Sequence, residues 1–117
     1  MLFDFDKFSR IAASVYPGGA YSLEETLNVF RYFFEKYEEV RGEPHPPIRA
    51  SQIVRIMLDM PYVEQRDRCG SIADIDPDCY PMLIDKYFQT PFKNCNYRIN
   101  HFFSGRIREL RFFEELF

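Results

Sequence analysis

The stretch that decides the fold is "SLEETLNVFRYFFEKYEEVRG", residues 22–42. Ser22 and Glu25 have the spacing of a capping box, in which each side chain satisfies a free backbone N–H of the other residue. Arg41 and Gly42 suit the last turn and the end of a helix. Between these signals, large apolar residues recur at intervals of four and three, which predicts one amphipathic helix with a buried stripe of Leu23, Leu27, Phe30, Phe34 and Tyr37.

The flanking sequence repeats this helical spacing, interrupted by proline and glycine. "PGG" at 17–19 ends the preceding pattern, "EPHPPI" at 43–48 reads as a stiff connector because proline fixes φ, and Pro61 closes the pattern after it. No segment alternates apolar and polar residues. The chain is therefore predicted to be all-α, with residues 1–117 forming a single helical domain, a compact bundle of five or six short helices. Besides 22–42, helices are expected near 5–15, 50–60, 76–90, 96–103 and from 106 onward.

Composition excludes several classes of protein. Fifteen basic and eighteen acidic side chains give a net charge of −3, which does not fit a polybasic nucleic-acid or membrane binder. No apolar run can span a bilayer, and Asp4 and Asp6 interrupt the run that a secretory leader would need. With only three cysteines, we expect reduced thiols in a cytoplasmic protein.

Two patterns of metal-ligand residues fail on spacing. Asp74, Asp76, Asp78 and Asp85 fall at calcium-loop positions, but Cys79 stands where the loop needs glycine, so a capped helix start at Asp76 or Asp78 is favoured. A zinc site lacks the close ligand pairs that structural zinc uses, which favours ordinary buried or loop thiols. We therefore expect no metal and no cofactor; the residues considered for zinc are Cys69, Cys79, Cys95 and His101.

A catalytic pair is also considered and set aside. His101 and Ser104 could meet on a helix, but nucleophilic catalysis also needs an orienting acid and an oxyanion site. Because the sequence shows neither, and no nucleotide-binding loop, we do not expect an enzyme.

The last part of the chain allows two interpretations. Residues 91–117 hold five basic and three acidic side chains, a net of +2, against −5 for residues 1–90. On a helical wheel Leu110 and Phe113 share one face and the arginines lie opposite, which predicts an amphipathic core helix. The alternative is a DNA- or RNA-binding surface in which Tyr97 or Phe102 stacks on bases. Its phosphate contacts would be Lys93, Arg98, Arg106, Arg108 and Arg111.

Three stretches carry a resemblance: "EPHPPIRASQIVRIMLDMPYV" (43–63), "IDPDCYPMLIDKYFQT" (75–90) and "NYRINHFFSGRIRELRFFEE" (96–115). Over about residues 23–115 the chain resembles uncharacterised small helical proteins carried by phages and integrative elements of gut Firmicutes. The resemblance implies a genomic setting in which replication, transfer and anti-defence accessories occur, anti-CRISPR proteins among them. It implies no functional residue.

Together these observations favour a non-catalytic protein-binding accessory over a nucleic-acid module, because Phe, Tyr and Arg are favoured at the centres of protein interfaces. An anti-CRISPR-like inhibitor of a host defence or nucleic-acid enzyme is one instance, and a homodimer is left open. The polar segment 62–75 is expected to be a loop that faces the partner. The expected partner-binding residues are Arg66, Arg68, Arg108 and Arg111.

Overall fold

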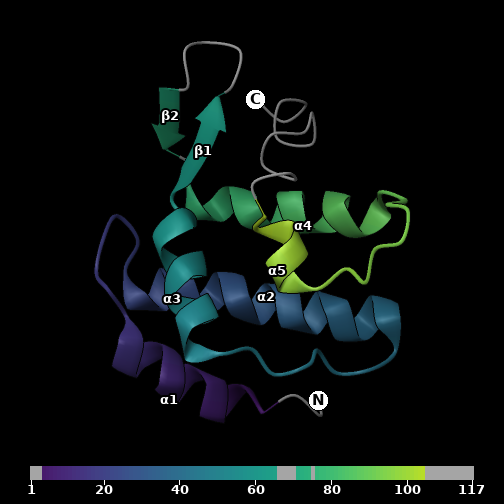
Figure 1. Ribbon diagram of the computed structural model, residues 1–117, viewed down its shortest axis with the longest axis horizontal. Helices are drawn as coiled ribbons and strands as arrows, with labels where there is room; N and C mark the ends of the chain where they lie inside the picture. Colours follow the sequence, from purple (N-terminus) through teal and green to yellow (C-terminus); the bar gives the residue numbers. More distant parts are fainter. Residues whose placement is uncertain (1–3, 66–70, 75, 105–117) are drawn as a thin grey trace.

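The computed structural model describes residues 4–65, 71–74 and 76–104. In these ranges the chain forms five α-helices and one short hairpin, so the prediction of an all-α bundle is confirmed (Figure 1). The elements are α1 (Phe5–Val15), α2 (Leu23–Arg41), α3 (Ala50–Asp59), β1 (Tyr62–Gln65), β2 (Ser71–Asp74), the 3₁₀ turn η2 (Pro77–Cys79), α4 (Tyr80–Gln89) and α5 (Ile99–Phe102). The terminal helix expected from residue 106 lies outside the described residues.

Helix α2 begins and ends where its local signals predict. Ser22 Oγ accepts the N–H of Glu25 at 3.1 Å, and a carboxylate oxygen of Glu25 accepts the N–H of Ser22 at 2.9 Å. At the other end, Gly42 has φ +75° and donates its N–H to the carbonyl of Glu38 at 2.9 Å. Both ends are thus satisfied by residues close in sequence.

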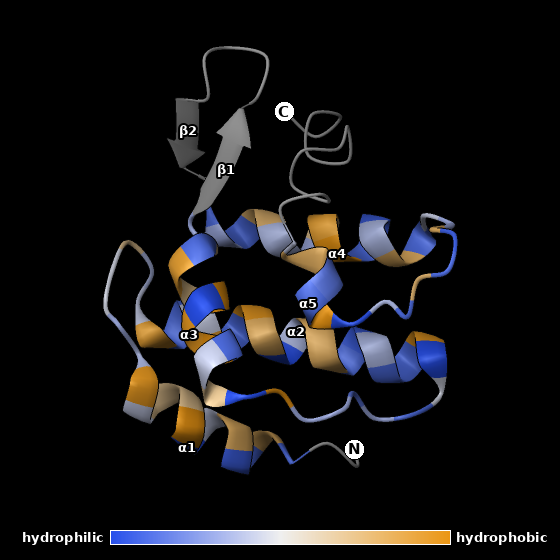
Figure 2. Cartoon of the chain, viewed as in Figure 1, coloured by the Kyte–Doolittle hydropathy of each residue, from blue (hydrophilic) through white to orange (hydrophobic). Residues whose placement is uncertain are grey.

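The buried face of α2 is wider than the predicted stripe. Val29 and Phe33 are buried together with Phe30 and Phe34, whereas Leu27 is only partly buried. The reason is that α2 packs against α1 on one side and α4 on another, as Figure 1 shows. Figure 2 shows the resulting bands of apolar and polar residues along both α1 and α2.

Aromatic rings fill the core between these helices. Phe33 of α2 lies within 5.5 Å of the ring centroid of Phe102 and 5.2 Å of that of Phe88. Phe34 meets Phe8 of α1 edge to face at 5.1 Å. Edge-to-face and tilted pairs of this kind add to the stabilisation that burial alone gives. The aromatic residues therefore serve mainly as core, as their number in the sequence indicates.

The sequence predicts a loop at 62–75, and this prediction is wrong for the eight residues that form β1 and β2. β1 and β2 pair antiparallel with Tyr62 opposite Asp74 and Gln65 opposite Ser71. Each strand is only four residues long, too short for an alternating pattern to stand out in the sequence. Pairing with the other strand supplies the hydrogen bonds that define them, and that pairing is not encoded locally. In Figure 1 the hairpin projects beyond the helices from the end of α3.

Two other boundaries refine the sequence prediction. Asp76 is the capping residue before α4: its carboxylate accepts the N–H of Asp78 at 2.9 Å, and the turn η2 leads into the helix. The helix expected near 96–103 is limited to α5, because Asn94 and Tyr97 take positive φ values of 55° and 57°. Residues in that conformation cannot continue a right-handed helix.

Candidate functional site

The residues predicted to bind a partner or nucleic acid fall largely outside the described part of the chain. Of those named for phosphate contact, Lys93 and Arg98 are described, and both are exposed in the segment between α4 and α5. Phe102 is fully buried, so it cannot be the residue that stacks on a base; Tyr97, the other residue named for this role, is partly buried. The residues outside the described ranges are Arg66, Arg68, Arg106, Arg108 and Arg111.

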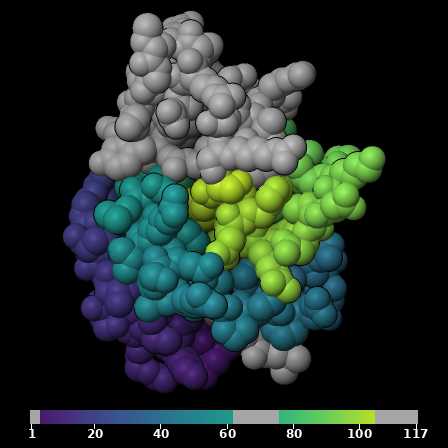
Figure 3. Space-filling model, in the orientation of Figure 1, coloured from purple at the N-terminus to yellow at the C-terminus, as the bar shows by residue number. Residues whose placement is uncertain are grey.

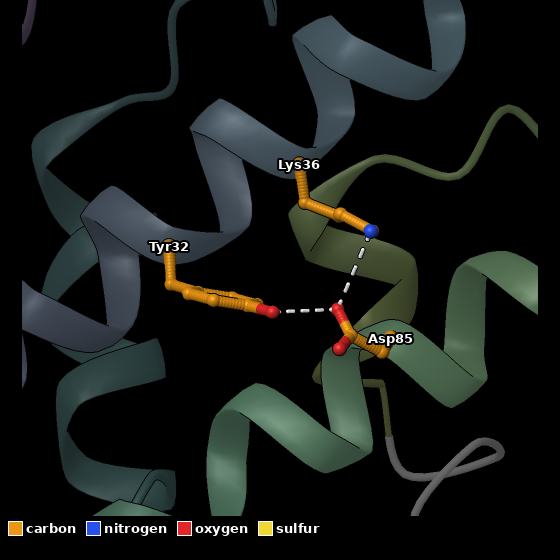
Figure 4. A network of polar contacts seen from close by, with 3 residues as sticks. All are labelled: Tyr32, Lys36 and Asp85. Carbon is orange, nitrogen blue, oxygen red and sulfur yellow. Dashed lines mark hydrogen bonds and ion pairs between the residues drawn. The ribbon is translucent and has the colours of Figure 1, made fainter.

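The aspartate of the calcium pattern in α4 has other partners. An oxygen of Asp85 accepts the hydroxyl of Tyr32 at 2.7 Å and lies 3.6 Å from Nζ of Lys36 (Figure 4). This hydrogen bond raises the pKa of Tyr32 to about 12. Among residues 4–65, 71–74 and 76–104, no three His, Cys, Asp or Glu side chains gather in a way that could hold a metal ion. The contacts of Asp85 with Tyr32 and Lys36 join α4 to α2.

His101 does not pair with Ser104 through its ring. The hydroxyl of Ser104 donates to the backbone carbonyl of His101 at 2.7 Å, a contact within one helical turn. The ring instead lies against Cys95 and Tyr87: Nδ1 is 3.2 Å from the Cys95 sulfur and 2.7 Å from the Tyr87 hydroxyl oxygen. Burial raises the pKa of Tyr87 above its ordinary value, so this hydroxyl keeps its proton.

Cys95 lies in a sharply bent segment. Its sulfur accepts the backbone N–H of Tyr97 at 3.2 Å and is 3.5 Å from the Tyr87 hydroxyl. Asn94 and Tyr97, on either side of it, both have positive φ, a conformation that costs a residue with a side chain about 1–2 kcal/mol. Surrounding contacts must therefore offset that cost.

Tyr97 supplies those contacts. Its hydroxyl donates to the carbonyl of Thr90 at 2.6 Å and accepts the N–H of Phe92 at 2.9 Å. The guanidinium of Arg41, at the end of α2, lies 5.4 Å from the centre of its ring. Tyr97 thus has partners at its hydroxyl and over its ring, and these join the segment that carries Cys95 to α2 and to the end of α4.

Cys95 and His101 open onto a half-enclosed groove of about 580 Å³. We call it the polar groove. It lies among α3, α5, the connector and the segment that carries Cys95; Figure 3 shows α5 between α3 and that segment. Its walls consist of His45, Pro46, Pro47, Ile48, Gln52, Asn94, Cys95, Asn96, Arg98, Asn100 and His101. One guanidinium and no carboxylate stand among these residues.

A second groove, of about 450 Å³, lies on the other side of the connector. We call it the apolar groove, because Ile11 of α1, Ile48 of the connector and three prolines are among the residues that line it. Ile11 is 36% exposed. The walls consist of Asp4, Lys7, Phe8, Ile11, Pro44, His45, Pro46, Pro47, Ile48 and Ile53. One carboxylate and one ammonium group give these walls no net charge.

His45 stands between the two grooves and is buried. Its Nδ1–H donates to the carbonyl of Pro46 at 2.7 Å, and its Nε2 accepts the N–H of Ile99 at 3.0 Å. Aromatic rings of α2 surround it, Tyr37 at 4.7 Å and Phe34 at 4.9 Å. Burial lowers the pKa of His45 to about 4, so the ring is neutral at pH 7.

Sequence reasoning placed Cys95 and His101 in one candidate zinc set, rejected that set on spacing, and did not consider the two as a reactive pair. They are six residues apart, a spacing that places them together neither on a helix nor on a strand. The backbone turns at Asn94 and Tyr97 bring them into contact. Asn94 tolerates that conformation well, whereas Tyr97 rarely adopts it, so the sequence gives only a weak signal here.

Among the residues that the structure describes, no helix is both long and apolar enough to cross a membrane. The chain matches no protein-family model, and neither a curated protein nor a solved structure matches it. The resemblance to proteins of Firmicutes phages and integrative elements therefore stays a prediction.

Proposed function

We propose that the protein is a non-catalytic, protein-binding accessory of a phage or integrative element, acting in the cytoplasm. The observation that carries this proposal is the apolar groove between α1 and the connector. Ile11 and Ile48 offer apolar surface there, within a volume in the range of about 300–1,000 Å³ that ligand pockets have. Inhibition of a host defence or nucleic-acid enzyme, in the manner of an anti-CRISPR protein, is the form of accessory that the sequence resemblance favours.

The occupant that fits this groove is an uncharged, apolar segment of a partner protein. Asp4 and Lys7 bring opposite charges to one end of it, so its walls favour neither an anion nor a cation. A phosphate backbone would need an excess of basic groups, which the groove does not have. Single exposed apolar residues elsewhere, such as Leu58 and Met82, do not form such a concave surface and are ordinary on protein surfaces.

The test compares Ile11→Lys with Met82→Lys. Both positions are exposed apolar residues on helices, but Met82 on α4 lies outside the groove. Tagged wild-type protein and both variants are cross-linked in host cells, and captured proteins are quantified by mass spectrometry. We expect one protein to be captured by the wild type and by Met82→Lys, and at least about tenfold less by Ile11→Lys, because a charge at an interface centre costs about 2 kcal/mol or more. The captured protein is then purified and its affinity measured directly.

Equal capture by the two variants would contradict docking in the apolar groove. Self-capture lost only in Ile11→Lys, with a change in oligomeric state, would replace the partner by a second copy of this chain. Capture of DNA or RNA that weakens steeply with salt would favour the nucleic-acid module instead, with Lys93 and Arg98 as the first residues to change.

A further inference from the structure

The polar groove contains a thiol beside a base. The Cys95 sulfur is 3.2 Å from Nδ1 of His101, a distance at which a proton can pass from one to the other. The backbone N–H of Tyr97 donates to the same sulfur at 3.2 Å, and the Tyr87 hydroxyl, which is 2.7 Å from the same Nδ1, lies 3.5 Å from the sulfur. A sulfur with an imidazole and a backbone N–H donor around it can hold negative charge, which is the reactive form of a cysteine.

The pair is also held in place before any ligand arrives. The Tyr97 hydroxyl donates to the Thr90 carbonyl and accepts the Phe92 N–H, which fixes the segment that carries Cys95, and His101 lies on α5. Cys95 is half-buried: it packs against the edge of the core and lines the groove. Its position resembles that of neither an inert core thiol nor a fully exposed one.

We propose that Cys95 and His101 form a nucleophilic pair, and that Cys95 undergoes thiol–disulfide exchange with small anionic disulfides bound in the polar groove. His101 Nδ1 takes the proton of the Cys95 thiol, and the thiolate attacks one sulfur of the disulfide. The S–S bond of the ligand breaks as the new one forms at Cys95. The other sulfur leaves as a thiolate and takes the proton back from the imidazolium. The disulfide is the oxidant, so the step balances.

The charge of the groove selects the class of disulfide. Arg98 is exposed at its rim, and Asn94, Asn96 and Asn100 offer amide donors. Because none of the described residues that line the groove is a carboxylate, they attract an anionic ligand without repelling it. A cationic disulfide is repelled by the guanidinium of Arg98, and no described carboxylate of the groove attracts it.

Among the described residues, Tyr87 of α4 and Tyr97 contact the pair, Arg98 and His45 line the same groove, and Arg41 at the end of α2 lies over the Tyr97 ring. None of these described groups is a carboxylate.

The test measures mixed-disulfide formation at pH 6 with oxidised glutathione, by mass mapping of each cysteine in the full chain. Cys79, also half-buried but without His101 beside it, is the reference thiol in the same molecule. Because His101 Nδ1 lies 3.2 Å from the Cys95 sulfur and can take its proton, we expect Cys95 to react about tenfold faster than Cys79. His101→Gln should remove most of that advantage.

Charge selection is tested with cystamine, a cationic disulfide, as the second probe. In the wild type the rate at Cys95 should be higher with oxidised glutathione than with cystamine. Arg98→Gln should narrow this difference severalfold. An unchanged ratio in Arg98→Gln would overturn the preference for anions.

A Cys95 rate no higher than that of Cys79 in the wild type would overturn the nucleophilic pair itself. So would a folded His101→Gln protein that reacts at the wild-type rate. If circular dichroism shows that His101→Gln is unfolded, the comparison of Cys95 with Cys79 in the wild type still decides. None of these outcomes depends on the apolar groove, so they leave the proposed function to its own test.

Discussion

His45 Nε2 accepts the backbone N–H of Ile99 at 3.0 Å. This bond joins the connector between α2 and α3 to the first residue of α5, a helix of only four residues. The N–H groups in the first turn of a helix have no partner within it, so a buried acceptor there stabilises the start of α5. A proton on Nε2 would face that N–H and destroy the bond. The arrangement therefore requires a neutral His45, which agrees with its lowered pKa.

The first prediction concerns pH. The pKa of His45 is about 4 in the folded protein against 6.5 unfolded, so acid favours the unfolded chain, where the ring protonates more readily. The stability that His45 contributes is complete above pH 6.5 and is lost as pH falls toward 4. The loss should be about 1.4 kcal/mol for each pH unit and about 3 kcal/mol in all. Urea unfolding at a series of pH values measures it.

His45→Gln is the control, because it removes the titrating group and keeps a side chain that can accept a hydrogen bond. Carboxylates also titrate toward pH 4, so the informative quantity is the difference between the wild type and His45→Gln. That difference should shrink as pH falls from 6.5 to 4. If the difference in free energy of unfolding between the two proteins does not change with pH, the folded state does not lower the pKa of His45.

The second prediction separates two residues of the predicted stripe of α2. Phe34 is fully buried against Phe8 and His45, whereas Leu27 is partly exposed. Phe34→Ala should lower the free energy of unfolding by about 3–5 kcal/mol, the usual loss for a large ring in a core. Leu27→Ala should cost less than about 2 kcal/mol, because less apolar area leaves water there. Equal losses in urea unfolding would contradict the observed packing of α2.

Local signals explain which parts of the fold were predictable. The ends of α2 depend on Ser22, Glu25 and Gly42, which act on their own neighbours in sequence, so the sequence predicts them correctly. The buried face of α2 depends on where α1 and α4 pack. The predicted buried stripe therefore included Leu27, which is only partly buried, and omitted Phe33, which is fully buried. Elements defined by distant partners were missed for the same reason, as β1 and β2 show.

The candidate site was less predictable than the fold. The sequence analysis considered His101 with Ser104 as a catalytic pair, and with Cys95 only in the candidate zinc set that it rejected. The contact with Cys95 depends on positive φ at Tyr97, which is unusual for an aromatic residue and is stabilised by tertiary contacts to Thr90 and Arg41. No pattern in the sequence specifies those contacts, because they join the end of α2 to the segment after α4.

The third prediction concerns the contact between α2 and α4 in Figure 4. Tyr32→Phe removes the hydrogen bond to Asp85 and should cost about 1 kcal/mol, the usual net value of such a bond. Lys36→Met removes an ion pair of 3.6 Å between side chains that are 25% and 37% exposed, and should cost about 0.5 kcal/mol or less. Urea unfolding of both variants measures which substitution lowers the free energy of unfolding more. A larger loss for Lys36→Met would mean that the ion pair, and not the hydroxyl, joins the two helices.

The pKa of Tyr32 provides an independent check on the same contact. The hydrogen bond to Asp85 is the largest cause of its rise to about 12, so Asp85→Asn should return it toward 10. The stability that this contact adds is present below pH 10 and is lost as pH rises through 12. NMR titration of labelled tyrosine, with Tyr32→Phe to assign the signal, measures the shift. A Tyr32 pKa that stays near 12 in Asp85→Asn would contradict the assigned cause.

The fourth prediction tests how α2 ends. Gly42 has φ +75°, and a Cβ added there would meet no atom within 4 Å. The cost of Gly42→Ala is therefore conformational alone, about 1–2 kcal/mol for the left-handed region, and no clash adds to it. Gly42→Asn should lose less, because asparagine tolerates that conformation better. Equal losses in urea unfolding for alanine and asparagine would show that the left-handed conformation is not what limits this position. A loss near zero for both would mean that the last turn of α2, including the bond from Gly42 to Glu38, does not contribute to the stability of the fold.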